Sequence, residues 1–335
     1  MANHPDHLKM LKEAGHPGIF LSLTRVPNSS RLFVGNSDGK VYDVDPLVEG
    51  GKVEFKPLEG HTSYVTGVAL AGETLVSGSY DCSLIWRNIT TGEIVRKIEN
   101  AHGKWIRQVK ASPDGKWIAS VGDDMVVRLW DAATGEKKHE LRGHDERTPN
   151  HFPSMLYACA FSADSTRLAS ADRIGRVNVW DVSGGAKLAT VDAPGLYTWD
   201  PKQRIHSIGG ARSVAFSPDG KTIVVGGIGH IGNIDHLDGP ARVEAFDWEK
   251  GEKLHEFVGE AKGLIETLHF APDNQWLIGA GGDNGGLIYC LDLASKKVIK
   301  GEKAPMHIHA GALSEAGDKL FLCGHGRIAV FSLEG

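Results

Sequence analysis

The stretch AHGKWIRQVKASPDGKWIASVGDDMVVRLWD, residues 101–131, carries three marks in a fixed order. A small residue precedes His102, a turn contains Asp124, and the dipeptide Trp130-Asp131 closes the stretch. Residues 126–130 have the β-branched and aromatic content that is typical of strands. Gly and Asp residues stand between the apolar segments, where tight turns need them. The stretch therefore predicts short consecutive strands joined by turns.

The same marks recur along the chain, so this stretch is one copy of a repeat. Gly-His or Ala-His pairs begin copies at His16, His61, His102 and His144. A period of about 40 to 45 residues with these marks is typical of a propeller blade. We therefore expect an all-β, seven-bladed β-propeller with four-stranded antiparallel blades, forming a single domain over residues 1–335. The seven copies place the second residue of the Trp-Asp position at Asp45, Asn88, Asp131, Asp181, Asp247, Asp292 and Ser332.

The two ends of the chain complement each other. The last copy stops at residues 331–335, one strand short of a blade, whereas residues 7–16 read like the outer strand at residues 138–144. We expect the N-terminal segment to supply the outer strand of the last blade. Such pairing closes the ring and leaves only short, protected strand edges.

The pairs, turns and Trp-Asp dipeptides resemble the WD-repeat β-propeller family over nearly the whole chain. The resemblance implies that the His, a Ser, the turn Asp and the Trp of a blade form a hydrogen-bonded network that is structural, not catalytic. In the fourth copy Ile174 occupies the turn position and Asp172 is the nearest substitute, so a weaker network is expected from there on. By position, the implied network residues are His16, Asp38, His61, Ser77, Asp81, His102, Ser120, Asp124, Trp130, His144 and Trp180.

Composition narrows the classes of function. The net charge of −5 gives no basic footprint for nucleic acid. No apolar run approaches the roughly 18 residues of a membrane span, and residues 1–20 lack a signal-peptide core. We expect a soluble, cytoplasmic protein without nucleic-acid or membrane partners. It is expected to be monomeric by itself, with its four cysteines reduced.

Three loops are longer than the repeat requires. One follows His144, one precedes Phe216, and one lies between Val225 and Phe246. In the family's topology all three emerge on one face, over blades four and five. Long loops on a rigid scaffold are where binding usually resides. Neutral length variation in tolerant surface loops is the alternative.

These loops contain His together with Trp, Tyr and Arg, and the last three residue types dominate the energetics of protein interfaces. We therefore expect a non-catalytic protein–protein interaction scaffold, which binds a protein or peptide through these loops and a flanking segment of blade three. The predicted partner-binding residues are Lys104, Trp105, Arg147, His151, Phe152, Tyr197, Trp199, Arg204, His206, His230, Asp235 and His236.

A second interpretation makes the protein a propeller enzyme or a metal-binding protein that uses the histidines and aspartates of the same loops. His206, His230 and Asp238 belong to that set, but their spacing fixes no geometry. The His307-Ile308-His309 segment is compatible with copper, yet alternation in any strand puts both rings on one face. The chain has no nucleophile elbow, phosphate loop or His-Glu-x-x-His motif. We predict no catalytic residue, no cofactor and no metal, and keep the second interpretation as the alternative.

Overall fold

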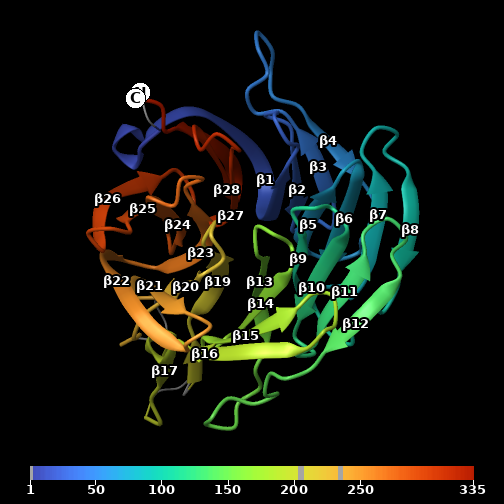
Figure 1. Cartoon of the computed structure of the whole chain (residues 1–335). Coiled ribbons are helices and arrows are strands. Elements are labelled where there is room, and N and C mark those ends of the chain that lie inside the picture. The colour runs from blue at the N-terminus through green and yellow to red at the C-terminus, as the bar shows by residue number, and fades with distance from the viewer. Residues whose placement is uncertain (1–2, 203–206, 233–236) are drawn as a thin grey trace.

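The computed structural model describes residues 3–202, 207–232 and 237–335. Over these residues the fold is all-β, with antiparallel sheets arranged around a central axis (Figure 1). The predicted β-propeller with four-stranded antiparallel blades is therefore confirmed at the level of its architecture. In the described ranges no helix is long and apolar enough to cross a membrane.

Five sheets contain four strands each, taken consecutively from the chain. The first contains β5 (Val65–Ala71), β6 (Thr74–Ser79), β7 (Leu84–Asn88) and β8 (Ile94–Ile98). The second contains β9 (Ile106–Ala111), β10 (Trp117–Gly122), β11 (Val127–Asp131) and β12 (Lys137–Leu141). The third contains β13 (Leu156–Phe161), β14 (Arg167–Asp172), β15 (Arg176–Asp181) and β16 (Lys187–Asp192). The fourth contains β19 (Ala211–Phe216), β20 (Thr222–Ile228), β21 (Pro240–Asp247) and β22 (Glu252–Lys262). The fifth contains β23 (Leu264–Phe270), β24 (Trp276–Gly282), β25 (Gly286–Asp292) and β26 (Lys297–Ala304).

A six-stranded sheet unites the two ends of the chain. Its order is β27 (Ile308–Leu313), β28 (Lys319–Ser332), β1 (Lys9–Arg25), β2 (Leu32–Asn36), β3 (Val41–Val44) and β4 (Phe55–Leu58). Lys9 of β1 lies opposite Ser332 of β28, and the His4 amide donates to the Leu333 carbonyl over 3.0 Å. Two short helices, η1 (Pro5–His7) and η2 (Pro194–Leu196), and a hairpin of β17 (Tyr197–Trp199) and β18 (Ser207–Gly209) complete the described elements.

The count of blades differs from the prediction. The sequence predicts seven separate blades, whereas the described residues form six sheets of four or more strands. The reason is the continuity of two long strands. Residues 320–324 of β28 pair with β27 and residues 325–332 pair with β1, while β1 itself continues into its pairing with β2. Strands expected in two blades therefore belong to one sheet.

The hydrophobic core lies between neighbouring sheets. The second strands, such as β10, are buried on both faces, whereas the outer strand β8 is almost entirely exposed. Between the β5–β8 and β9–β12 sheets, Trp86, Val109, Ile118 and Trp130 form one apolar cluster. Burial of each large apolar side chain contributes about 1.5–3 kcal/mol. Gly67 permits this packing, since a Cβ there would lie 2.4 Å from the Val109 amide nitrogen.

The first strands of the repeats surround the central axis. Strands β1, β5, β9, β13, β19, β23 and β27 contact one another in that order, and β27 contacts β1. They line a central cavity of about 230 Å³, into which Arg107, Tyr157, Arg212, Glu266 and His309 contribute. The segments before β5 and β9 lie beside the turns after β6 and β10, since the Tyr80 amide donates to the Tyr64 carbonyl and the Asp123 amide donates to the Trp105 carbonyl.

Candidate functional site

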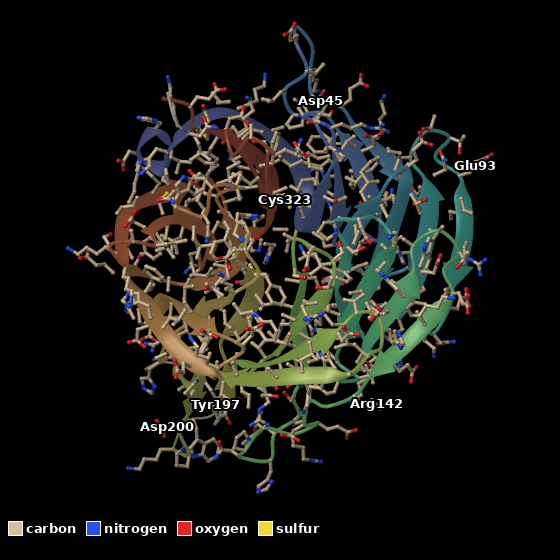
Figure 2. All side chains as sticks on the ribbon, in the orientation of Figure 1. Asp45, Glu93, Arg142, Tyr197, Asp200 and Cys323 are labelled. Atoms are coloured by element: carbon tan, nitrogen blue, oxygen red, sulfur yellow. The ribbon has the colours of Figure 1, made fainter. Side chains whose placement is uncertain are left out.

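The three long insertions contact one another. Tyr197 Oη, on the β17–β18 hairpin, donates to Asn150 Oδ1 of the first insertion over 2.9 Å. The rings of Phe152 and Trp199 lie 5.7 Å apart. In the third insertion, the Ile231 amide donates to Thr198 Oγ1 over 3.0 Å. Figure 2 shows Tyr197 and Asp200 projecting beyond the ring on this hairpin.

The predicted partner-binding residues differ in exposure. Phe152 and Tyr197 are half-buried because they hold the insertions together. Arg204, His206, Asp235 and His236 lie outside the described residues, as does most of the predicted loop metal cluster. The exposed members are Lys104, Trp105, Arg147, His151, Trp199 and His230.

The first insertion also meets blade three. Arg147 lies opposite Pro153 in an isolated bridge, and its guanidinium donates to the His151 carbonyl over 2.7 Å. Arg147 and Lys104 line a groove of about 330 Å³ between the two segments. The structure therefore brings Lys104 to the same surface as the first insertion.

Beside this groove lies a stack of three aromatic side chains, of which only Trp105 is among the residues predicted from the sequence. Tyr64 precedes β5, Tyr80 follows β6 and Trp105 precedes β9. The Tyr80 and Trp105 rings are stacked with centroids 4.4 Å apart, and Tyr64 stacks on Tyr80 at 5.6 Å. Tyr64 and Trp105 keep 47% and 49% of their surface exposed, so the ends of the stack face solvent. We name these three side chains the aromatic stack.

Arginines continue this surface toward the central cavity. The Arg107 guanidinium lies 4.9 Å from the Tyr80 ring centroid and 5.2 Å from that of Tyr157. Two hydrogen bonds of 2.7 and 2.9 Å join Arg107 to the Asp123 carboxylate. Burial disfavours the charge of Arg107, but the bonds with Asp123 raise its pKa above the usual value. On the far side, Arg212 lies 4.1 Å from the Tyr157 ring. These contacts are cation–π interactions, which fix the orientation of each ring.

The histidines of the repeat pairs make buried hydrogen bonds. His102 Nδ1 lies 2.9 Å from Asp124 Oδ1, and His102 Nε2 lies 2.7 Å from Ser120 Oγ. Trp130 Nε1 donates to the same hydroxyl over 2.9 Å. Burial opposes the charge of Asp124, yet hydrogen bonds from His102 and Arg128 hold its pKa well below the usual range. An ionised carboxylate locked in this way suits a structural network better than proton transfer.

Two other sheets contain versions of this arrangement. His61 Nε2 lies 2.9 Å from Ser77 Oγ, and His61 Nδ1 lies 3.0 Å from Asp81 Oδ2. In the β13–β16 sheet, His144 Nε2 lies 2.8 Å from Ser170 Oγ, which also accepts from Trp180 Nε1 over 2.8 Å. Asp172 Oδ2 lies 3.4 Å from His144 Nδ1, the longest of the three His–Asp contacts.

The predicted pairing of His16 with Asp38 is wrong. His16 Nδ1 lies 2.6 Å from the Pro17 carbonyl, and its ring packs 4.4 Å from the Tyr42 ring. Asp38 instead accepts a hydrogen bond from Tyr42 Oη over 2.6 Å. A tyrosine hydroxyl beside the turn takes the carboxylate that the family pattern assigns to the histidine.

The chain matches known proteins over its repeats. The family model for the WD domain, G-beta repeat, matches residues 52–86 and 92–131. Nuclear distribution protein PAC1 of Arthroderma otae is 32% identical over 190 residues, which are 50% of this chain and 36% of that protein. Apoptotic protease-activating factor 1 of Rattus norvegicus is 27% identical over 241 residues, 72% of this chain and 17% of that protein. Small ribosomal subunit protein RACK1y of Oryza sativa subsp. japonica is 30% identical over 173 residues, 50% of this chain and 46% of that protein.

The chain therefore spans less than half the length of each of these three relatives. The matched repeats coincide with strands that surround the central axis, and the His–Ser–Trp hydrogen bonds lie inside those sheets. The sequence matches and the architecture together support a WD-repeat β-propeller family.

Proposed function

We propose that this chain is a non-catalytic scaffold that binds a protein or peptide across the face formed by the aromatic stack and the three insertions. The observation that carries the proposal is the set of large aromatic rings held rigidly at the surface. Trp105, Tyr64 and Trp199 expose 49%, 47% and 39% of their area, although each ring is packed against another. Rigid, half-exposed aromatics supply contact area at a low entropic cost, which is the character of interface hot spots.

The surroundings of these rings favour a polypeptide partner. Lys104 and Arg147 border the groove beside the stack, and Asp123, Asp124 and Glu146 line the same groove. Charges of both signs around an apolar centre match the polar rim and apolar core of protein interfaces. The names of the relatives refer to nuclear distribution, apoptosis and the ribosome, so they support a general scaffold role without selecting one process.

Further parts of the proposal concern the chain as a whole. We propose that residues 1–335 form one domain whose ring is closed by pairing of the N-terminal strand with β28, and that the protein works as a cytoplasmic monomer. The register from Lys9 opposite Ser332 to Ile19 opposite His325 supports closure by the N-terminal segment. We also propose that the His–Ser–Asp–Trp networks act structurally within the sheets.

Matched substitutions test the binding face. Trp105→Ala and Trp199→Ala remove exposed rings from the face, whereas Val95→Ala and Leu188→Ala remove exposed apolar side chains from outer strands β8 and β16. Each variant serves as bait for affinity capture from lysate of the native host, with quantitative mass spectrometry. We expect the same partner to be reduced at least tenfold with the two Trp variants and retained with the two controls. Equal capture by all four variants refutes the proposed face.

A further inference from the structure

Three histidines and a glutamate gather at the end of the central cavity where the first strands begin. His307 immediately precedes β27, His309 lies within it, and His325 lies in β28. The three imidazole centroids are 4.6, 5.0 and 5.1 Å apart. Glu266 reaches the same place from β23 of the neighbouring sheet, so the cluster joins two sheets.

Among the described residues, two of the ligand atoms in this cluster have no hydrogen-bond partner. One ligand atom each from Glu266, His307 and His309 lies within 4.8 Å of the others. Within the described ranges, His307 Nε2 and His309 Nε2 are buried and accept or donate no hydrogen bond. His307 Nε2 lies 3.9 Å from Glu266 Oε1, which is too long for a hydrogen bond. A buried polar atom without a partner needs an explanation, and an ordered water or an ion is a common one.

A hydrogen bond at the second ring nitrogen fixes the orientation of His307. Its other nitrogen, Nδ1, lies 2.6 Å from the carbonyl oxygen of Asp283, in the turn after β24. This contact assigns the proton to Nδ1 and turns the lone pair of Nε2 toward Glu266. Metal-ligating histidines are oriented by such a bond to a backbone carbonyl. His307 side-chain exposure is 8%, so the ring has little freedom to turn away.

We propose that Glu266, His307 and His309 form a binding site for a zinc-class divalent transition metal ion, with a water molecule as the fourth ligand. A ligand set of imidazole and carboxylate suits zinc and similar transition metal ions. It does not suit magnesium, which prefers six oxygen ligands. Zinc bonds of about 2.0–2.1 Å place tetrahedral ligands roughly 3.4 Å apart. The three ligand atoms, which lie within 4.8 Å of one another, therefore need to approach by at most about 1.4 Å. This inference does not depend on the proposed partner surface.

Protonation states agree with this geometry. Burial, together with the neighbouring histidines, lowers the pKa of His309 to about 4, so its imidazole is neutral at pH 7. Burial raises the pKa of Glu266, but His307 and Arg212 more than offset it, and the carboxylate is ionised. A neutral imidazole and an ionised carboxylate are the forms that bind metal.

The competing explanation is an ion pair between protonated His307 and Glu266. Burial disfavours the charge on His307, yet Glu266 raises its pKa above the usual value. An ion pair, however, leaves His309 Nε2 without a partner, whereas a metal ion satisfies both imidazoles and the carboxylate. The two explanations therefore differ in the role of His309.

Titration of the tag-free full chain with zinc distinguishes them. Chelator-treated protein is titrated with zinc chloride at neutral pH by calorimetry, and magnesium chloride serves as the control ion. We expect about one equivalent of zinc to bind, with affinity at least tenfold lower for His307→Gln, His309→Gln and Glu266→Gln. His139→Gln is the matched control, because His139 lies on outer strand β12 and contacts the Ser183 carbonyl through Nε2.

Two further measurements separate a metal site from a structural cluster. Cobalt added to the wild type should give the visible absorption of a four-coordinate site, and the His307→Gln/His309→Gln double variant should lack it. Thermal melting of metal-free variants shows whether they are folded. Absence of zinc binding, undiminished binding by the double variant, or loss of binding only with His230→Gln in the third insertion overturns the proposal.

Discussion

Replacing Ser120 with alanine tests how much the buried hydrogen-bonded chain stabilises a sheet. Ser120 Oγ joins His102 Nε2 and Trp130 Nε1 at 2.7 and 2.9 Å, and all three residues are buried. The hydroxyl accepts a hydrogen bond from Trp130 Nε1 and makes its second hydrogen bond with His102 Nε2. Alanine leaves the indole N–H and the imidazole nitrogen without partners. Each costs about 1–3 kcal/mol, so we expect a loss of about 2–6 kcal/mol in the free energy of unfolding.

The equivalent serines of two other sheets serve as controls, because their replacement should lower the free energy of unfolding by different amounts. Ser170 has the same two partners, His144 and Trp180, so Ser170→Ala should cost about as much as Ser120→Ala. Ser77 joins only His61, because Trp86 Nε1 donates instead to the Ala132 carbonyl over 3.0 Å. Ser77→Ala therefore leaves one group unsatisfied and should cost about 1–3 kcal/mol, about half the loss expected for Ser120→Ala.

Urea denaturation followed by circular dichroism and by tryptophan fluorescence measures these differences. Coincident transitions from the two probes establish that unfolding is cooperative, which the comparison of free energies requires. Equal losses for the Ser77 and Ser120 variants contradict the assignment of two bonds to Ser120. An unchanged midpoint for Ser120→Ala refutes the structural role altogether.

Two more perturbations test the fold. Removal of residues 1–12 deletes the pairing of Lys9, Met10 and Lys12 with β28, so the melting temperature should fall; an unchanged value rejects closure by this segment. Burial opposes ionisation of Asp124, but bonds from His102 and Arg128 lower its pKa below the ordinary value of 3.8. A carboxyl group with a lowered folded pKa stabilises the protein above its unfolded pKa, and that stabilisation is lost as the pH falls through the folded pKa. We expect urea midpoints to drop below about pH 4, and less steeply for Asp124→Asn; parallel profiles contradict this.

Much of the architecture follows from local sequence marks. The Gly-His pair, the turn and the Trp-Asp dipeptide are all within one repeat, so a single sequence displays them together. The number of separate sheets does not follow, because it depends on whether β28 and β1 continue through their bends. Gly326 at φ +67° and the register shift between Gly15 and Ile19 show how these strands remain continuous. Neither feature has a sequence signature in the repeat pattern.

Less of the candidate site than of the fold could be predicted from the sequence. Trp105 and the insertions could be chosen by loop length and residue type, but Tyr80 stands in an ordinary turn. Its importance arises from stacking on Trp105, a residue of the next sheet. The failed His16–Asp38 pairing has a similar cause, since Tyr42 lies on the adjacent strand and takes the carboxylate. Contacts between repeats are set by packing, and a pattern within one repeat does not contain them.

The networks inside the sheets also position the surface residues beside them. The Thr62 amide donates to Asp81 Oδ2 over 2.9 Å, and the Gly103 amide donates to Asp124 Oδ2 over 3.0 Å. Tyr64 follows Thr62 by two residues, and Trp105 follows Gly103 by two residues. Tyr64 and Trp105 are the exposed ends of the aromatic stack. Each loop is therefore tied to the turn of its own sheet before a partner arrives. The entropy of ordering these rings is already lost during folding, so a partner that binds at the proposed face need not supply it at the stack. The insertions are ordered instead by their contacts with one another.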